Sequence, residues 1–476
     1  MNRTTERVAV ASLATVLLLL RSSSLVFFEA SPFDSDQAIF GLMAKHVSEL
    51  RAFSAFGYGQ SHILAVDAWL AAPLFYVFGS SVTALKLPIL GINLAVVLIF
   101  LLCLEREIGL RPALALVPTL FFIMAPVGTA YVLLQASGGN VEPFLYVLLI
   151  WLVRRRPMVL GGLLAFGFLN REFTAYGLAA LLFLETLDGS LLTRRGLQDK
   201  LLAAVSAASV FGFVEALESI GNPAGPGTTA NTVAYAGQLQ FFLSRFCWEL
   251  SGIPTWLAEV FGPHLENLYA SDSPGGSRWL WVTLGTTVAG ALARVVVLAY
   301  PVARESWRRW QFPIYIALVG LAAAVVPAVA RCGAVVERYV LMALFLLPGI
   351  TALYLILERN ARLRAFLVLV VLLWASANAV EHGRYARAIH GAPPDSTQLL
   401  ADYLVSNGIR FATSDYWTAY NVTFRSAERV IMASSDFVRI NQYQSIVRAR
   451  RSDAVRVTRT PCDGGHEVAG YHVCPP

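Results

Sequence analysis

Charged residues are scarce in this sequence. Asp, Glu, Lys and Arg make up 14% of its 476 residues, whereas an ordinary globular protein has about 25%. Apolar runs, among them residues 11–20, 92–104, 201–217 and 365–374, recur along the first 380 residues. They approach the length of about 20 residues with which a helix crosses the bilayer. The composition therefore excludes an ordinary soluble protein and indicates a polytopic membrane protein.

Three other patterns are missing. The net charge of +6 is spread in small arginine groups without a basic stripe interleaved with aromatics, so nucleic-acid binding is not indicated. No Gly-rich loop follows a strand and precedes a helix, which leaves no nucleotide-binding motif. The five cysteines lack the spacing of a zinc site. Cys462 and Cys474 lie close together near the end of the chain and are candidates for a disulfide.

Arginine groups predict the topology, because short cytoplasmic loops are rich in Lys and Arg. If all the groups face the cytoplasm, the chain has about eleven spans, with its N-terminus cytoplasmic and its tail outside a cell (inner or plasma) membrane. Arg21 interrupts the first apolar run and no cleavage site follows, so this run is a retained span. The groups lie at 3–7, 106–111, 154–156, 194–200, 304–309 and 359–364, and the expected spans are 8–28, 83–104, 113–130, 141–153, 158–170, 172–187, 200–219, 279–301, 312–330, 337–357 and 363–380.

Two segments decide that count. Residues 62–79 are apolar but contain Asp67 and Pro73, and a span here would move most arginine groups outside, so we expect an interfacial or re-entrant helix. Residues 157–187 carry Asn170, Arg171 and Glu172 at their centre, and two short spans meeting at the outer face avoid burying that charge in lipid.

The expected organisation is a transmembrane module over 1–380 and a small extracytoplasmic α/β domain over 381–476. The module has outer loops at 28–82 and 220–278. In the tail, residues 396–408 have a helical pattern, and the strand-like runs are 410–415, 421–426 and 429–434. Tyr416, Trp417 and Tyr420 cluster there, either to stack on a sugar or to form the core of the domain or its seat on the membrane.

The densest polar signal, at residues 31–50, directly follows the first span. Asp34 with Gln37 three residues later reads as a helix start, so Asp34 is either the N-cap or a site residue. Helical spacing places Asp36 on the apolar face of Phe40 and Met43. A carboxylate at an apolar boundary suits a general base, and stabilisation of the helix dipole is the alternative.

This arrangement resembles the GT-C superfamily of membrane glycosyltransferases. The likeness extends over residues 8–220, and the branch it is most similar to comprises the protein O-mannosyltransferases and lipid A aminoarabinose transferases. Their first outer loop carries an Asp-Glu-Ala motif whose Asp is the catalytic base, and Asp36-Gln37-Ala38 matches it with Gln in place of Glu. The resemblance implies an all-α polytopic fold, a polyprenyl-phosphate sugar donor, inversion at the sugar, and a lipid, glycan or protein acceptor.

Further site residues follow from that expectation. Glu142 opens the fourth span at the outer face and is either a second carboxylate that assists Asp36 or a plain interfacial residue. Arg171 is a phosphate ligand or pairs with Glu172. Arg331 and Arg338 bind the phosphate or extend to lipid headgroups. The outward cations available to the phosphate are Lys86, Arg171, Arg331 and Arg338.

Metal binding and other functions stay open. His46 and His62 are weak candidates to hold a divalent cation such as Mg²⁺ or Mn²⁺ with Asp36, but neither has the spacing of a known metal motif, and the sequence requires no cofactor. A transporter or flippase of lipid-linked sugars would also have many spans. A non-catalytic assembly protein that binds lipid carriers is the third hypothesis, which the Gln37 replacement leaves open.

Overall fold

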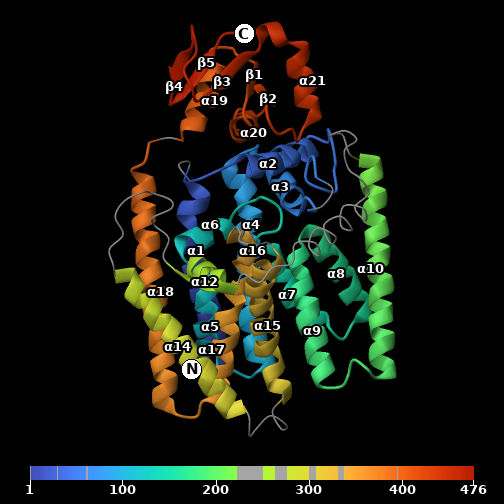
Figure 1. The fold of residues 1–476 in the computed structure, drawn as a ribbon, viewed down its shortest axis with the longest axis vertical. Helices are drawn as coiled ribbons and strands as arrows, with labels where there is room; N and C mark the ends of the chain where they lie inside the picture. Colours follow the sequence, from blue (N-terminus) through green and yellow to red (C-terminus); the bar gives the residue numbers. More distant parts are fainter. Residues whose placement is uncertain are drawn as a thin grey trace.

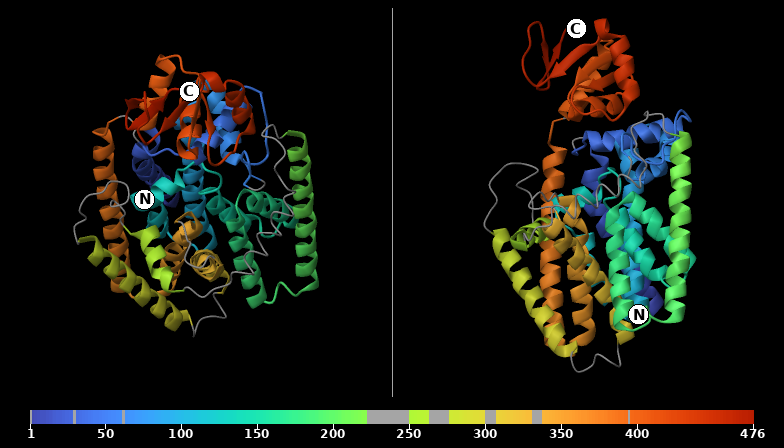
Figure 2. Two further views of the ribbon diagram at one scale, coloured as in Figure 1. Left: turned by 45° about the horizontal axis from the view of Figure 1, so that its top comes forward. Right: turned by 45° about the vertical axis from the view of Figure 1, so that its right-hand side comes forward.

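The structure, a computed structural model, describes residues 2–28, 31–60, 63–221, 250–262, 276–299, 307–330, 337–393 and 395–476. A bundle of helices carries a small α/β domain at one end, and the two chain termini lie at opposite ends of the molecule (Figures 1 and 2). The bundle helices are α1 (Arg3–Phe27), α4 (Val82–Glu107), α5 (Pro112–Ile123), α6 (Val127–Leu133), α7 (Glu142–Val153), α8 (Pro157–Asn170), α9 (Ala175–Leu187), α10 (Arg194–Gly221), α12 (Ile253–Phe261), α14 (Gly276–Ala299), α15 (Trp307–Ala330), α16 (Glu337–Val340), α17 (Leu346–Leu357) and α18 (Ala361–His390).

Helices occur at each expected span, but not all are long enough to cross a membrane. Within the described residues six helices meet the length and hydropathy of a span, and the bent pair α5–α6 would make a seventh. Helices α7, α8 and α9 have 12, 14 and 13 residues, short of the about 20 that hydrocarbon requires. The expected number of about eleven spans is therefore not confirmed.

Several arginine groups meet at the end of the bundle where the N-terminus lies. Arg7 pairs with Glu105 and Arg154 pairs with Glu107, at 2.7 and 2.9 Å between nitrogen and oxygen. The Arg3 guanidinium donates to the backbone oxygen of Leu110 at 3.4 Å. The arginine-rich loops and the α/β domain thus lie at opposite ends of the bundle (Figure 1).

Arg21 lies within α1 and supports a break between two other helices. Helices α5 and α6 meet at a bend of 86°, which frees backbone carbonyls at the end of α5. The guanidinium of Arg21 donates to the Phe122 oxygen at 2.9 Å, and His382 of α18 donates to the Ala125 oxygen at 2.8 Å. A cation at a helix C-terminus is favourable, so the charge inside the first span has a structural partner.

Two helices cap the bundle beneath the α/β domain: α2 (Ser35–Ser48) and α3 (Val66–Phe78) (Figure 1). With 13 residues and Pro73 inside it, α3 is not among the helices long enough to span. It packs against α2 and α4. The first loop therefore forms a layer between the bundle and the α/β domain.

The α/β domain follows α18, which continues to His390, so the domain begins after the expected boundary at 381. Its sheet has the order β2-β1-β3-β5-β4, with β1 parallel to β2 and β3, and β5 antiparallel to β3 and β4. Cys462 and Cys474 form a disulfide, as the sequence suggested. The elements are α19 (Ser396–Ser406), β1 (Phe411–Ser414), α20 (Tyr416–Arg425), β2 (Ile431–Ser434), α21 (Asn441–Ala449), β3 (Val455–Thr458), β4 (His466–Val468) and β5 (Tyr471–Cys474).

One expected strand is wrong. Residues 421–425 form the end of α20 and Ser426 is its C-cap, although Val, Thr and Phe favour strands. Asp415 caps this helix by accepting from the Thr418 amide at 3.1 Å. Ala419 and Val422 pack into the core of the domain, whereas Tyr416, Tyr420 and Phe424, spaced four apart, pack against the bundle side. Burial of two helix faces overrides the strand preference.

Candidate functional site

A cavity of about 200 Å³ lies where the first loop, the bundle and the α/β domain meet. Several polar side chains at its walls come from elements far apart in the sequence. The lining residues are Asp36, Ile39, Phe40, Gly57, Tyr58, Gln60, Ile63, Ser137, Arg171, Arg338, Tyr339, Tyr416 and Arg439.

Asp36 is the carboxylate of this cavity. It is the second residue of α2, and its side chain is 30% exposed. The Tyr416 hydroxyl donates to its Oδ1 at 2.5 Å, and Arg338 Nη1 lies 3.9 Å from its Oδ2. One carboxylate oxygen is thus held by a phenol, while the other faces a guanidinium. A carboxylate that lines a cavity could accept a proton from a hydroxyl bound there.

Asp34 has a structural position. It caps α2 by accepting from the Gln37 amide at 3.0 Å and does not line the cavity. Burial raises the pKa of Asp34, against the Gln37 hydrogen bond, which lowers it. Of the two roles expected for Asp34, the structure shows that of the helix cap.

Arg171 and Arg338 reach the same cavity from the α8–α9 junction and from α16. Arg171 is buried, and its Nε donates to the Gly138 oxygen at 2.7 Å. None of the ion pairs found among the described residues joins Arg171 to Glu172. Among the described residues, Arg338 Nε is buried and has no hydrogen-bond partner. The two guanidinium groups repel each other, so an anion between them would be favourable.

Glu142 is not among the residues that line the cavity. It opens α7, is 2% exposed and faces the carboxyl group of Asp67 in α3. The Gly138 amide donates to Asp67 Oδ2 at 2.8 Å. Two carboxyl groups buried in contact cannot both be charged, so one of them holds a proton. This pair was not predicted from the sequence, in which Asp67 served only to assign the topology. The available signal is an acidic residue inside an apolar run.

The remaining candidates do not assemble at the cavity. Lys86 is buried and donates to the Leu25 oxygen at 2.9 Å, at the end of α1. The ring of His46 contacts the Tyr58 hydroxyl at 2.9 Å and Glu428 at 3.1 Å. Arg331 and His62 lie outside the described residues. No group of three or more His, Cys, Asp or Glu side chains suited to a metal occurs in the part of the chain that the structure describes.

Two cavity residues come from the α/β domain, 380 or more positions after Asp36. Tyr416 belongs to the aromatic cluster seen in the sequence, whereas Arg439 was not among the residues predicted for the site. Arg439 Nη1 donates to the Gly59 oxygen at 3.0 Å, and its guanidinium lies 4.6 Å from the centre of the Phe437 ring. No local pattern in the sequence joins these residues to the first loop.

No family model matches the chain, and no curated protein matches it by sequence. Solved structures do match it in fold. ArnT from Cupriavidus metallidurans bound to undecaprenyl phosphate is 11% identical, with a TM-score of 0.65 over 98% of this chain and 97% of that one. The chain has a GT-C fold.

Oligosaccharyltransferase structures share this GT-C fold. The Archaeoglobus fulgidus enzyme in complex with Zn and sulfate is 12% identical, with a TM-score of 0.56 over 94% of this chain and 67% of that one. AglB from the same organism, in complex with an inhibitory peptide and a dolichol-phosphate, is 13% identical, with a TM-score of 0.50 over 95% and 69%. The expected GT-C resemblance is thereby confirmed at the level of the fold.

Proposed function

We propose that this protein is an integral membrane glycosyltransferase that transfers a sugar from a polyprenyl-phosphate carrier to a hydroxyl acceptor. The observation that carries the proposal is one cavity in which a half-buried carboxylate, Asp36, faces two guanidinium groups, Arg171 and Arg338. The fold supports it, because structures of this fold are bound to undecaprenyl phosphate and dolichol-phosphate.

In the proposed reaction Asp36 is the general base. It takes the proton of the acceptor hydroxyl as the hydroxyl oxygen attacks the anomeric carbon. The bond from that carbon to the phosphate oxygen breaks, and the phosphate leaves as an anion that Arg171 and Arg338 stabilise. A single displacement of this kind inverts the configuration at the sugar.

Glu142 has a different role in this proposal from the one expected of it. The acid pair of Glu142 and Asp67 holds the Gly138 amide, and the Gly138 oxygen accepts from Arg171. The pair therefore positions the loop that orients Arg171 and does not touch the acceptor. We assign no residue to a divalent cation; comparing activity in Mg²⁺, Mn²⁺ and a chelator tests that requirement separately.

The proposed orientation places the cavity and the α/β domain on the extracytoplasmic face of the cell membrane. The positive-inside rule supports this orientation, because Arg3, Arg7 and Arg154 and the segment 105–110 that they contact lie at the opposite end of the bundle. A cysteine-labelling scan of the two ends in intact cells checks the orientation.

Asp36→Asn tests the function. The amide keeps the size of the side chain but accepts no proton, so we expect transfer to fall by about 100-fold or more in proteoliposomes supplied with polyprenyl-phosphate sugars. Asp402→Asn, an exposed position of α19, is the matched control and retains activity. Full activity of the Asp36→Asn protein would remove Asp36 as the base.

A further inference from the structure

The α/β domain covers α2 along its whole length. At the start of α2, the Ser35 hydroxyl donates to the Trp417 oxygen at 2.8 Å, and the Asn421 amide donates to the Phe33 oxygen at 2.8 Å. Phe33 and Ser35 directly precede Asp36 in the sequence. The domain is thus hydrogen-bonded to the chain directly before the candidate base.

The middle of α2 is in close contact with α20. A Cβ atom on Gly41 would lie 2.5 Å from a ring carbon of Phe424. The Phe424 ring also packs against Phe33 and Phe75, at 5.4 and 6.1 Å between ring centres. Only glycine allows this approach, so the sequence of α2 is adapted to the docked domain.

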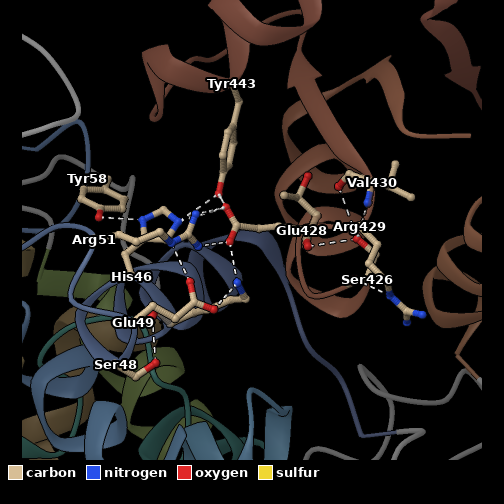
Figure 3. Close-up of polar contacts among 12 residues, drawn as sticks. His46, Ser48, Glu49, Arg51, Tyr58, Ser426, Glu428, Arg429, Val430 and Tyr443 are labelled. Atoms are coloured by element: carbon tan, nitrogen blue, oxygen red, sulfur yellow. Dashed lines mark hydrogen bonds and ion pairs between the residues drawn. The ribbon is translucent and has the colours of Figure 1, made fainter. Parts of the chain in front are cut away.

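Glu428 joins the domain to the end of α2 (Figure 3). Its carboxylate accepts from Lys45 at 2.7 Å and from the Tyr443 hydroxyl at 2.8 Å, and it also contacts His46 and Arg51. Its backbone φ of 63° is uncommon for a residue other than glycine. Several donors from both domains converge on this one carboxylate, and hydrogen bonds to an ionised group are stronger than those between neutral groups.

The Tyr416 side chain extends from the docked domain to the carboxylate of Asp36. Its amide donates to Asp436 at 2.8 Å, and its ring packs edge-on against Trp417, Tyr420 and Phe437. Burial and the charge of Asp36 raise the pKa of Tyr416, so the phenol is a neutral donor at pH 7. With its ring held on three sides, the hydroxyl has a fixed position from which to hold Asp36 Oδ1.

We propose that Tyr416 is a positioning residue for Asp36, and that the α/β domain completes the catalytic site by docking on α2 and delivering this hydroxyl. The proposal rests on the proposed function of Asp36. By holding Oδ1, the phenol directs Oδ2 toward the cavity, where the acceptor hydroxyl must approach. A loosely held carboxylate would sample unproductive rotamers and react more slowly.

Tyr416→Phe in the full-length protein, reconstituted with a polyprenyl-phosphate sugar, tests the proposal. We expect kcat to fall by about 10-fold to 100-fold while KM for the donor changes by less than about twofold. A hydrogen bond to an ionised carboxylate favours the ionised form, so we expect its loss to move the acid limb of the pH–rate profile to higher pH. A merely structural role would reduce the amount of folded protein without moving this limb.

Tyr403→Phe is the matched control, because this tyrosine of α19 packs on His466 away from the cavity. It should leave kcat and the pH profile unchanged. Glu428→Gln provides a second route that leaves Tyr416 in place. Weakened docking should increase hydrogen exchange in residues 35–48 and lower kcat with little change in donor KM.

Two results would overturn the inference while leaving the proposed function intact. One is a Tyr416→Phe protein with the wild-type kcat and pH profile when Asp36→Asn is inactive. The other is a Glu428→Gln protein whose α2 exchanges faster but whose kcat is unchanged. If Asp36→Asn itself retains activity, the proposed function fails first, so the two failures are distinguishable.

Discussion

Arg171 and Arg338 face one cavity from different surroundings. Arg171 is buried and donates to the backbone of the loop at Gly138, whereas the Arg338 side chain is 37% exposed. A buried guanidinium that donates to the backbone stabilises the fold, in addition to binding any ligand. The Arg338 guanidinium is more exposed and is available to bind the phosphate of the donor. Replacing Arg338 and replacing Arg171 should therefore have different effects on activity and stability.

Arg338→Gln should lower kcat/KM for the lipid-phosphate donor by about 10-fold to 100-fold, because a charge-assisted hydrogen bond to phosphate is lost. Its melting temperature in detergent should stay near that of the wild type. Arg171→Gln should lower both kcat/KM and the melting temperature, since the Gly138 oxygen also loses its donor. Arg359→Gln, exposed at the other end of the bundle, is the control. Equal behaviour of the Arg338 and Arg359 variants would contradict a phosphate-binding role.

At the scale of elements, helix α20 buries two of its faces. One face enters the core of the α/β domain, and the other, which carries Tyr416, Tyr420 and Phe424, rests on the layer formed by α2 and α3. This double burial explains why a segment with strand-forming residues is helical. It also makes the fit between α2 and α20 sensitive to single methyl groups.

Gly41→Val should therefore disturb docking. The new side chain overlaps the Phe424 ring, and overpacking of this kind costs about 1–3 kcal/mol. We expect faster hydrogen exchange in α2 and reduced transfer activity. Adding Phe424→Ala should recover part of the exchange protection, because the double variant removes the overlap. Gly91→Val in α4, where a Cβ meets no atom within 4 Å, is the control. Strictly additive effects of the two changes would contradict a direct contact.

At the scale of the whole molecule, Glu428 links docking to pH. Burial pushes the pKa of Glu428 up, but hydrogen bonds from His46, Arg51 and Lys45 outweigh burial and hold it well below its usual range. A lowered pKa in the docked state means that docking gains stability above the ordinary glutamate value of about 4.3 and loses it as the pH falls further. Tyr443 also faces this carboxylate, and Glu49 contacts Arg51 and Lys45.

The α/β domain should therefore stay docked from about pH 5 to pH 8 and begin to release below about pH 4. Hydrogen exchange in residues 35–48, measured across this range, checks the direction of the change. In Glu428→Gln the increase on acidification should be smaller, because the titrating group is gone. Release on raising the pH from 6 to 8 would contradict this account.

The sequence by itself determined the features that depend on local pattern. Scarce charge and long apolar runs require a membrane bundle, and the spacing of Asp34 and Gln37 marks the start of α2, which places Asp36 in its first turn. The spacing of Cys462 and Cys474 pointed to the disulfide that the structure contains. Each of these follows from residues close together in the chain.

Only the tertiary structure decided which distant groups meet. It turned Lys86 toward the carbonyls at the end of α1, set Glu142 against Asp67, and brought Tyr416 to Asp36 across 380 positions. Such contacts depend on how helices pack and on which buried polar groups lack other partners. A local pattern carries no information about that packing. The place of Asp36 in the first turn of α2 was therefore predictable, whereas the hydroxyl that holds its carboxylate was not.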